Sequence, residues 1–261
     1  MPKLFDLAGK VALVAGGGGY LGRPICETFA AHGATVVVAD LRRHAAEAVA
    51  RAITQNGGKA HAVVIDTGDE QSINDVVNAV HREHGQLDVL VNTSVYCTGK
   101  SHAKGTVDDW QRCLQVTLTG AFLLARAASR IMLPQARGSI IHFSSMYGLV
   151  SPDPRNYADE DSVNPPDYGA AKAGVLQLTR YQAVQWGAHG VRVNAIVPGP
   201  FPNPTIQQHD PAFVDRLSQR VPLNRIGQAN EIAGPTLFLA SDASSYVNGA
   251  SLIVDGGWTA W

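Results

Sequence analysis

Residues 11–22 read Val-Ala-Leu-Val-Ala-Gly-Gly-Gly-Gly-Tyr-Leu-Gly, an apolar run that passes directly into a cluster of glycines. Five consecutive apolar residues predict a buried strand over 11–15. Leu21, Ile25 and Phe29 follow at helical spacing and predict a helix after the glycines. Glycine permits a tight turn and a close approach to a pyrophosphate, and the start of a helix offers free N–H groups to phosphate. The stretch therefore favours a dinucleotide site over a turn with a purely structural role.

The rest of the chain repeats this alternation of apolar runs and amphipathic stretches. Further runs rich in Val and Ile, apolar on both faces, are typical of strands buried in a parallel sheet. These runs are 34–39, 61–65, 87–91, 139–143, 191–197 and 251–254. Between them, Ile73, Val76, Val77 and Val80 have the spacing of one helix face. The sequence thus predicts an α/β fold, a doubly wound parallel sheet in a single domain over 1–261.

Composition and charge exclude several classes of protein. The chain of 261 residues has 21 Lys and Arg against 22 Asp and Glu, a net charge of −1, so nucleic acid is not an expected partner. No apolar run approaches the roughly 18 residues of a membrane helix, and the first residues do not read as a signal peptide. The three cysteines lack close spacing, which argues against disulfides and cysteine zinc sites and favours the cytoplasm.

The histidines do not predict a metal site. None of the nine forms a pattern such as H-E-x-x-H, so we expect no bound metal. His81 and His84 lie near the end of a predicted helix, where a solvated or C-terminal charge role is favoured over ligation. His142 lies within the predicted strand 139–143 and is interpreted as a packed or hydrogen-bonded strand residue.

The end of the second predicted strand bears on the choice of dinucleotide. Asp40 follows the run 34–39, where a carboxylate can accept hydrogen bonds from the adenosine ribose and repels a 2′-phosphate. Arg42 and Arg43 follow at once and could hold that phosphate instead. We favour NAD over NADP on this pattern, with a solvated Asp40 as the alternative.

A tyrosine and a lysine form the candidate catalytic pair. Tyr168 and Lys172 are four residues apart in a predicted helix, so both side chains share one helix face. A phenol is a weak acid at neutral pH, and a nearby ammonium lowers its pKa. Ser145, at the end of the strand 139–143, offers a hydroxyl to a substrate carbonyl. Two proline-rich segments, 151–166 and 198–205, leave carboxyl ends of strands, where open α/β sheets bind ligands.

Taken together, the chain resembles the classical short-chain dehydrogenases/reductases over nearly its whole length. The motifs that carry the resemblance occur in the family's order. They are Gly16 to Gly22, Asp40, Asp66-Thr67, Leu90-Val91-Asn92, Ser145, Tyr168 to Lys172, Pro198-Gly199, 225–233, 241–249 and 254–257. The resemblance implies a Rossmann fold that binds NAD(P)(H), hydride transfer between an alcohol and a carbonyl, and a homotetramer.

The resemblance also assigns roles to residues of this sequence. Tyr168 is expected to be the catalytic acid and base, Lys172 to lower its pKa and hold the nicotinamide ribose, and Ser145 to orient the reacting oxygen. Asp66 is expected beside the adenine and Asn92 beside the ribose. The expected cofactor-binding set is Gly16, Gly19, Tyr20, Leu21, Gly22, Asp40, Asp66, Thr67, Asn92, Tyr168, Lys172, Pro198 and Gly199.

Three departures from the family pattern stand out. Tyr20 replaces the middle glycine of the turn, so an aromatic ring is expected to alter or cover the phosphate approach. Thr117 stands where the family has the asparagine of its catalytic tetrad, and its hydroxyl is expected to serve a partial proton relay. Ser145 and Tyr168 are 23 positions apart, about ten more than usual in the family. This longer form resembles a sub-branch that includes proteins of surface-polysaccharide and flagellin-sugar modification.

The longer segment supplies candidate substrate contacts. Its prolines restrict the backbone, and Arg155 and Tyr157 are able to bind a polar or anionic group. We expect Ser145, Arg155 and Tyr157 at the substrate. The alternative is a solvent loop, or one that packs on a neighbouring subunit. The exposed aromatic C-terminus, 258–261, is expected at a subunit interface.

The sequence therefore predicts an NAD(H)-dependent oxidoreductase that interconverts a secondary alcohol and a ketone. The expected substrate is small and polar, such as a sugar or sugar derivative. Two alternatives remain: an NADP-dependent carbonyl reductase of the 3-oxoacyl type, and a dinucleotide-binding protein without turnover.

Overall fold

The Val- and Ile-rich runs form the strands of one parallel sheet in the computed structural model, which describes residues 4–261. Residues 1–3 of the predicted domain lie outside this description. The seven strands found in the described residues are β1 (Val11–Ala15), β2 (Thr35–Asp40), β3 (Lys59–Val64), β4 (Val89–Asn92), β5 (Gly138–Phe143), β6 (Val191–Pro198) and β7 (Ser251–Val254). Their order is β3-β2-β1-β4-β5-β6-β7, so the winding reverses between β1 and β4. A reversal of this kind opens a ligand crevice at the carboxyl ends of the strands.

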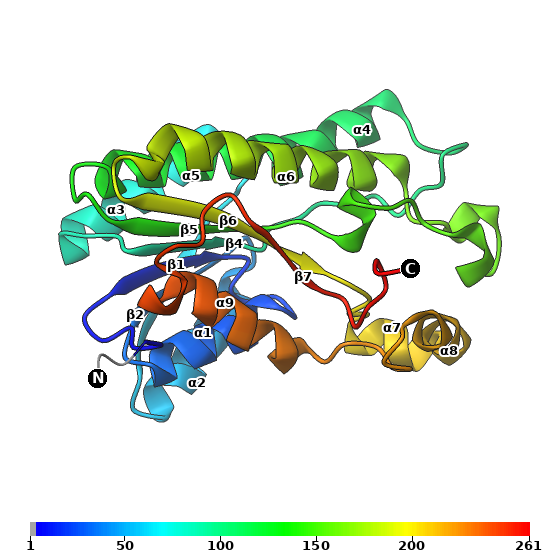
Figure 1. The fold of residues 1–261 in the computed structure, drawn as a ribbon, viewed down its shortest axis with the longest axis horizontal. Helices are drawn as coiled ribbons and strands as arrows, with labels where there is room; N and C mark the ends of the chain where they lie inside the picture. Colours follow the sequence, from blue (N-terminus) through cyan, green and yellow to red (C-terminus); the bar gives the residue numbers. More distant parts are fainter. Residues whose placement is uncertain (1–3) are drawn as a thin grey trace.

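Helices cover both faces of this sheet (Figure 1). Their bounds are α1 (Gly22–Ala31), α2 (Arg43–Gln55), α3 (Glu70–His84), α4 (Val107–Leu114), α5 (Gly120–Met132), α6 (Pro166–Gly187), α7 (Pro204–His209), α8 (Pro211–Arg220) and α9 (Ala233–Ala240). In Figure 1, α1, α2 and α9 lie below the sheet, α3 to α6 lie above it, and α7 and α8 lie beyond its right-hand end. None of the helices in residues 4–261 has the length and apolar character needed to span a membrane. The predicted doubly wound Rossmann fold is confirmed.

The core is divided between the two faces of the sheet because side chains alternate along each strand. Leu13 of β1 packs toward α3 and α5, whereas Ala12 and Val14 pack toward α1 and α2. All three are fully buried. Both faces of the central strands are thus apolar, which is why the sequence showed continuous apolar runs rather than alternation.

Local signals fix the ends of α3, which connects β3 to β4. The Asp69 carboxylate accepts hydrogen bonds from the backbone N–H groups of Gln71 and Ser72 and caps the start of the helix. Gly85 adopts a left-handed conformation, with φ of 70°, and ends the helix after His84. The last turn of α3 therefore has a defined position beside the edge strand β3.

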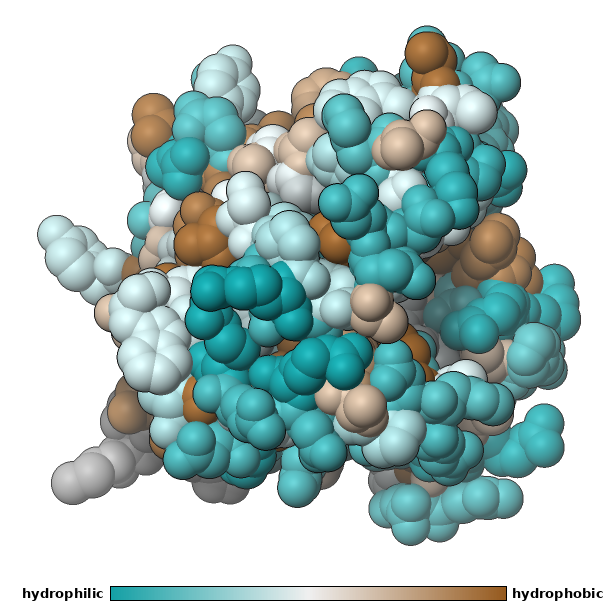
Figure 2. Space-filling view, turned by 90° about the vertical axis from the view of Figure 1, so that its right-hand side faces the viewer, coloured by the Kyte–Doolittle hydropathy of each residue, from teal (hydrophilic) through white to brown (hydrophobic). Residues whose placement is uncertain are grey.

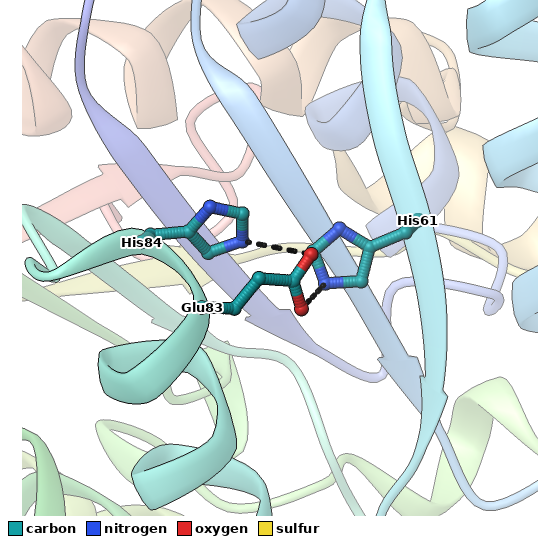
Figure 3. Close-up of side chains that lie close together, drawn as sticks. All are labelled: His61, Glu83 and His84. Atoms are coloured by element: carbon teal, nitrogen blue, oxygen red, sulfur yellow. Dashed lines mark ion pairs between the residues drawn. The ribbon is translucent and has the colours of Figure 1, made fainter.

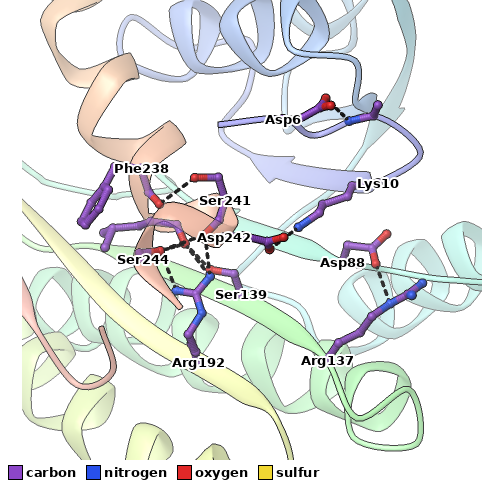
Figure 4. A network of polar contacts seen from close by, with 12 residues as sticks. Asp6, Lys10, Asp88, Arg137, Ser139, Arg192, Phe238, Ser241, Asp242 and Ser244 are labelled. Atoms are coloured by element: carbon purple, nitrogen blue, oxygen red, sulfur yellow. Dashed lines mark hydrogen bonds and ion pairs between the residues drawn. The ribbon is translucent and has the colours of Figure 1, made fainter. Parts of the chain in front are cut away.

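A polar network closes the amino ends of the strands, opposite the ligand crevice (Figure 4). The Asp88 carboxylate accepts a hydrogen bond from the backbone N–H of Val11 and pairs with Arg137. Lys10 pairs with Asp242, which follows α9. These contacts join the beginnings of β1 and β4 to neighbouring segments. Charge pairs thus occupy the amino edge of the sheet, and the carboxyl edge is the one open to ligands.

Candidate active site

The glycine turn packs so closely that larger residues would collide with backbone. Gly16 has φ of +78°, and a Cβ atom on it would lie 2.3 Å from Thr93 Oγ1. A Cβ on Gly22 would lie 2.1 Å from the carbonyl oxygen of Gly16. Leu21 stands at the N-cap of α1, and among the described side chains none caps this helix. In the first turn the Arg23 N–H donates to the carbonyl oxygen of Gly19 and Pro24 has no N–H, so the N–H of Gly22 is the group available to an anion such as a pyrophosphate.

A cavity of about 510 Å³ lies next to this turn. It is lined by residues from the ends of β1, β2, β3 and β4, which meet at the crevice. Among the predicted cofactor residues, those that line it are Gly16, Gly19, Asp40, Asp66 and Thr67. The free helix terminus, the carboxylate of Asp40 and this cavity fit the pyrophosphate and adenosine parts of a nicotinamide dinucleotide.

Asp40 is held in place at the adenosine end of the cavity. Its side chain is buried, and its carboxylate accepts hydrogen bonds from the backbone N–H groups of Gly18 at 3.1 Å and Arg42 at 3.0 Å. The Arg42 guanidinium lies 3.5 Å from the same carboxylate and lines the cavity. Arg43 instead lies 3.8 Å from Glu47 on the exposed side of α2 and does not line the cavity.

Several predicted cofactor residues lie elsewhere. The Asn92 side chain is buried and accepts a hydrogen bond from the backbone N–H of Ser94, so Thr93 and Ser94 face the cavity in its place. Pro198 is buried at the end of β6. Tyr20 and Gly199 line a second, larger cavity, which Ser145 and Tyr168 also line.

The candidate catalytic residues come together at the end of β5 and the start of α6. Pro166 begins α6, and Tyr168 and Lys172 follow on one helix face. The Lys172 Nζ atom donates a 2.7 Å hydrogen bond to the carbonyl oxygen of Phe143 and lies 5.6 Å from the centre of the Tyr168 ring. The Ser145 hydroxyl accepts a hydrogen bond from the backbone N–H of Tyr147, and Ser145 lines the same cavity as Tyr168. The predicted trio thus lies together at the end of β5.

Burial dominates the ionisation of this trio. It raises the pKa of Tyr168 to about 12, and the nearby Ser145 hydroxyl opposes that rise. Burial also lowers the pKa of Lys172 to about 8. Both shifts favour the uncharged forms, because a charge loses its hydration when it is buried. The depression of the Tyr168 pKa by the charge of Lys172 stays a prediction.

Thr117 occupies a π-helical turn, Gln115–Thr119, between α4 and α5. Its hydroxyl is buried, accepts a hydrogen bond from the backbone N–H of Tyr96 at 3.2 Å and donates to the carbonyl oxygen of Tyr96 at 3.3 Å. Single π turns of this kind occur often at functional sites. The hydroxyl is thereby engaged with the segment after β4 and does not line either cavity.

The second cavity, of about 630 Å³, lies at the carboxyl ends of the strands and is bounded by Ser145 and Tyr168. Val95 lines both cavities, so the two adjoin. The lining is largely aromatic or apolar, and among its residues Asp210 is the charged one while no Lys or Arg takes part. Figure 2 shows this end of the molecule, where hydrophilic side chains predominate and hydrophobic ones gather in smaller patches.

Comparison with known proteins places the chain in a family. A family model described as enoyl-(acyl carrier protein) reductase matches residues 19–259. D-threitol dehydrogenase of Mycolicibacterium smegmatis is 33% identical over 262 residues, covering 98% of this chain and 95% of the relative. The crystal structure of a short-chain type dehydrogenase/reductase from Mycobacterium marinum superposes with a TM-score of 0.88 at 32% identity, covering 98% and 97% of the two chains. The chain belongs to the short-chain dehydrogenase/reductase family.

Other relatives define the chemistry of this short-chain dehydrogenase/reductase. The structure of a gluconate 5-dehydrogenase from Burkholderia cenocepacia, in complex with NADP and tartrate, superposes with a TM-score of 0.89 at 30% identity, covering 99% and 98% of the chains. The trans-4-hydroxycyclohexanecarboxylate dehydrogenase of Sinomonas cyclohexanicum is 38% identical, covering 97% and 94%. This chain is accordingly an NAD(P)-linked oxidoreductase that interconverts a secondary alcohol and a ketone on a polar substrate.

The long segment of this short-chain dehydrogenase/reductase, between Ser145 and Tyr168, forms a wall of the second cavity. It contains three short 3₁₀ turns, Met146–Gly148, Pro154–Asn156 and Glu160–Ser162. Tyr157 lines the cavity, and its hydroxyl oxygen lies 2.7 Å from that of Tyr147. The segment thus contributes to the cavity through Tyr157, while residues 158–162 are exposed.

Arg155 is not placed as predicted. Its guanidinium makes a bidentate contact with the Asp153 carboxylate, its side chain is 81% exposed, and it does not line the cavity. The carboxylate two residues earlier captures the guanidinium and holds it at the surface. The prediction of a substrate contact by Arg155 is thus corrected, while Tyr157 remains at the cavity.

Helix α8 supplies cavity residues that the sequence did not reveal. Phe213 packs against Tyr157 with ring centres 5.3 Å apart, and both line the cavity. The Arg216 Nε atom donates a 2.7 Å hydrogen bond to the carbonyl oxygen of Asn156. Arg220 lies 3.2 Å from Asp153. No local motif marks these residues, because their role arises only when α8 packs on a segment about 60 residues away.

Proposed function

We propose that residues 1–261 form one catalytic domain that uses NAD(H) to interconvert a secondary alcohol and a ketone on a small, neutral polar substrate. The observation that carries this proposal is that Ser145, Tyr168 and Lys172 lie together at the end of β5, with Ser145 and Tyr168 lining one of two adjoining cavities. One cavity has the features of a dinucleotide site, and the other is open to a small substrate. A sugar alcohol or a cyclic diol fits the proposal.

The proposed mechanism assigns each residue a task at a stated atom. The hydroxyls of Ser145 and Tyr168 hydrogen-bond the substrate oxygen. Tyr168 gives its phenol proton to the substrate oxygen when a ketone is reduced; in the reverse direction its phenolate, favoured by the positive charge of Lys172, takes the alcohol proton. When bound, the nicotinamide cofactor accepts or supplies the hydride. The Lys172 Nζ atom is held by the carbonyl oxygen of Phe143 beside Tyr168 and would hold a ribose hydroxyl of the cofactor.

Preference for NAD rests on the environment of Asp40. Its carboxylate faces the adenosine cavity and neutralises Arg42, so a 2′-phosphate would meet a negative group and an already paired guanidinium. The other cofactor residues are proposed to be Gly16, Gly19, Leu21, Gly22, Asp66 and Thr67, with Tyr20 and Gly199 on the substrate side.

The cofactor test compares kcat/KM for NAD and NADP. We expect NAD to be preferred, and Asp40→Ala to shift the preference toward NADP by at least about tenfold, since the change removes a repulsive charge. Arg43→Ala is the matched control, because Arg43 pairs with Glu47 outside the cavity. Equal use of both cofactors by the unaltered protein would contradict the proposal.

The neutral character of the substrate rests on the lining of the second cavity. Hydroxyl and amide groups of Tyr147, Tyr157 and Asn164 can bind substrate hydroxyls, while Asp210 opposes a carboxylate. A panel of threitol, other polyols and cyclic diols should therefore give higher kcat/KM than gluconate. Preference for gluconate would contradict this part of the proposal.

An NADP-dependent reductase of the 3-oxoacyl type is a second candidate. The observation in its favour is the apolar lining of the cavity, together with 32% identity over 251 residues to the 3-oxoacyl-[acyl-carrier-protein] reductase of Thermotoga maritima. Turnover of an acetoacetyl thioester with NADPH, faster than any polyol reaction, would establish it. Binding of NAD without turnover of any panel member would instead indicate a dinucleotide-binding protein without catalysis.

We further propose a cytoplasmic homotetramer. The exposed side chains of Trp261, Tyr246 and Ile253, near the edge strand β7, support burial against another subunit. The free cysteines Cys26, Cys97 and Cys113 suit a reducing compartment. Light scattering after size exclusion tests the assembly, and cell fractionation tests the location.

A further inference from the structure

A histidine of β3 and the last two residues of α3 meet at the sheet edge opposite β7 (Figure 3). His61 Nε2 lies 3.8 Å from one carboxylate oxygen of Glu83, and His84 Nε2 lies 3.8 Å from the other. One ligand atom from each residue lies within 4.8 Å of the other two. The histidines are 23 positions apart, so no sequence spacing could have revealed their meeting.

The polar atoms of this cluster lack the partners that such groups normally have. The His84 Nε2 atom is buried and, among the described residues, has no hydrogen-bond partner. The two 3.8 Å contacts with Glu83 are too long for hydrogen bonds. The three side chains thus face one another without a hydrogen bond between any two of them.

We propose that His61, Glu83 and His84 bind a Zn²⁺ ion. Zinc is bound by imidazole nitrogen and carboxylate oxygen at about 2.0–2.2 Å, which places tetrahedral ligand atoms roughly 3.4 Å apart. Both contacts with Glu83, at 3.8 Å, are close to that value, and the three ligand atoms lie within 4.8 Å of one another. Two histidines and one glutamate supply three ligands, and a water molecule completes the tetrahedron. The two imidazole nitrogens and the single carboxylate favour zinc over calcium or magnesium, which prefer oxygen ligands.

The position at the end of α3 also favours a cation. Glu83 places a negative charge in the last turn, where the helix dipole is already negative. A divalent ion between Glu83 and the histidines compensates both. It also joins the end of α3 to the edge strand β3, so binding should stabilise the folded state, by an amount that rises with the logarithm of the ion concentration above the Kd.

The test titrates zinc chloride into the protein, free of any histidine tag, in an isothermal calorimeter. We expect one saturable site. Its affinity should fall at least about tenfold in Glu83→Gln, His61→Gln and His84→Gln, because the loss of even an indirect support of a metal ligand costs that much. His81→Gln is the matched control, because His81 lies in the same last turn, is exposed and is outside the cluster.

Two further readouts identify the site. Co²⁺ bound in place of zinc should give the visible bands of a tetrahedral complex in the unaltered protein and in His81→Gln, but not in Glu83→Gln. Zinc should raise the melting temperature of the unaltered protein and of His81→Gln, but not that of Glu83→Gln. Glu83→Gln keeps side-chain size at an exposed position, so folding is preserved. The proposal would be overturned if the unaltered protein showed no saturable zinc binding. It would also be overturned if Glu83→Gln and His84→Gln bound zinc as tightly as the unaltered protein, because other histidines would then hold the ion.

Discussion

The Lys172 Nζ atom donates a 2.7 Å hydrogen bond to the carbonyl oxygen of Phe143, which joins the first turns of α6 to the end of β5. The Ser144 hydroxyl makes a second link by donating to the carbonyl oxygen of Lys172 at 2.8 Å. Both links are buried. They place Ser145, one residue further along the chain, against Tyr168. Lys172 thus has a positioning role in addition to its charge.

Replacing Lys172 by Met should change how stability depends on pH. The Lys172 pKa falls from 10.5 to about 8 on folding. Between these pH values the unfolded chain holds a proton that the folded chain has released, so unfolding of the unaltered protein becomes harder as pH rises. The gain between pH 8 and pH 10 relative to Lys172→Met should be about 2 kcal/mol. Urea unfolding of both proteins at pH 8 and pH 10 measures it. Parallel behaviour would mean that Lys172 keeps its ordinary pKa.

Tyr168→Phe should remove most turnover and spare cofactor binding. The ring and its packing remain, but the transferable proton is lost, and such groups contribute roughly 10²–10⁴-fold to the rate. Steady-state kinetics and fluorescence titration with NADH measure the two effects. Tyr181→Phe, on the exposed side of the same helix, is the control and should behave like the unaltered protein. Near-normal turnover in Tyr168→Phe would refute the mechanism.

Thr117→Val should reduce both stability and turnover. The change leaves the backbone N–H of Tyr96 without its partner, which costs about 1–3 kcal/mol, and loosens the segment that leads to the cavity. Thr117→Ser restores the hydroxyl and should recover both properties. Thermal unfolding and kcat are measured on all three proteins. Lost turnover with unchanged stability would instead support a direct proton relay through the hydroxyl.

Tyr157→Phe should raise the substrate KM roughly threefold to tenfold, which corresponds to about one hydrogen bond. The change removes a hydroxyl at the cavity and frees its partner, Tyr147. The Kd for NAD should not change. Arg155→Ala is the control, since Arg155 is bound to Asp153 at the surface. A higher KM in Arg155→Ala would instead indicate that Arg155 contacts the substrate.

Strands and the catalytic contact could be predicted because each depends on local pattern. Strands β1 and β7 begin and end as expected, and β3 begins two residues earlier than expected, at Lys59 rather than His61. Burial on both faces makes such runs conspicuous. Tyr168 and Lys172 share a helix face by spacing alone, and β5 ends beside them because parallel strands end at one edge.

Other features depend on contacts that no local pattern encodes. Asp153 binds the Arg155 guanidinium and so sets the direction of that side chain. The position of Thr117 depends on a π turn, whose extra residue has no sequence signature. Phe213 reaches the cavity only because α8 packs on a distant segment.

The wall formed by Tyr157 and Phe213 has a practical consequence for redesign. Both rings belong to segments outside the sheet, and these segments are tied to each other by Arg216 and Arg220. A specificity graft from a relative should therefore carry residues 149–164 and 204–220 as one unit. If residues 149–164 were moved alone, the carbonyl oxygen of Asn156 would lose its hydrogen bond from Arg216. If both segments are moved together, that bond is kept and the residues of the dinucleotide cavity stay unchanged.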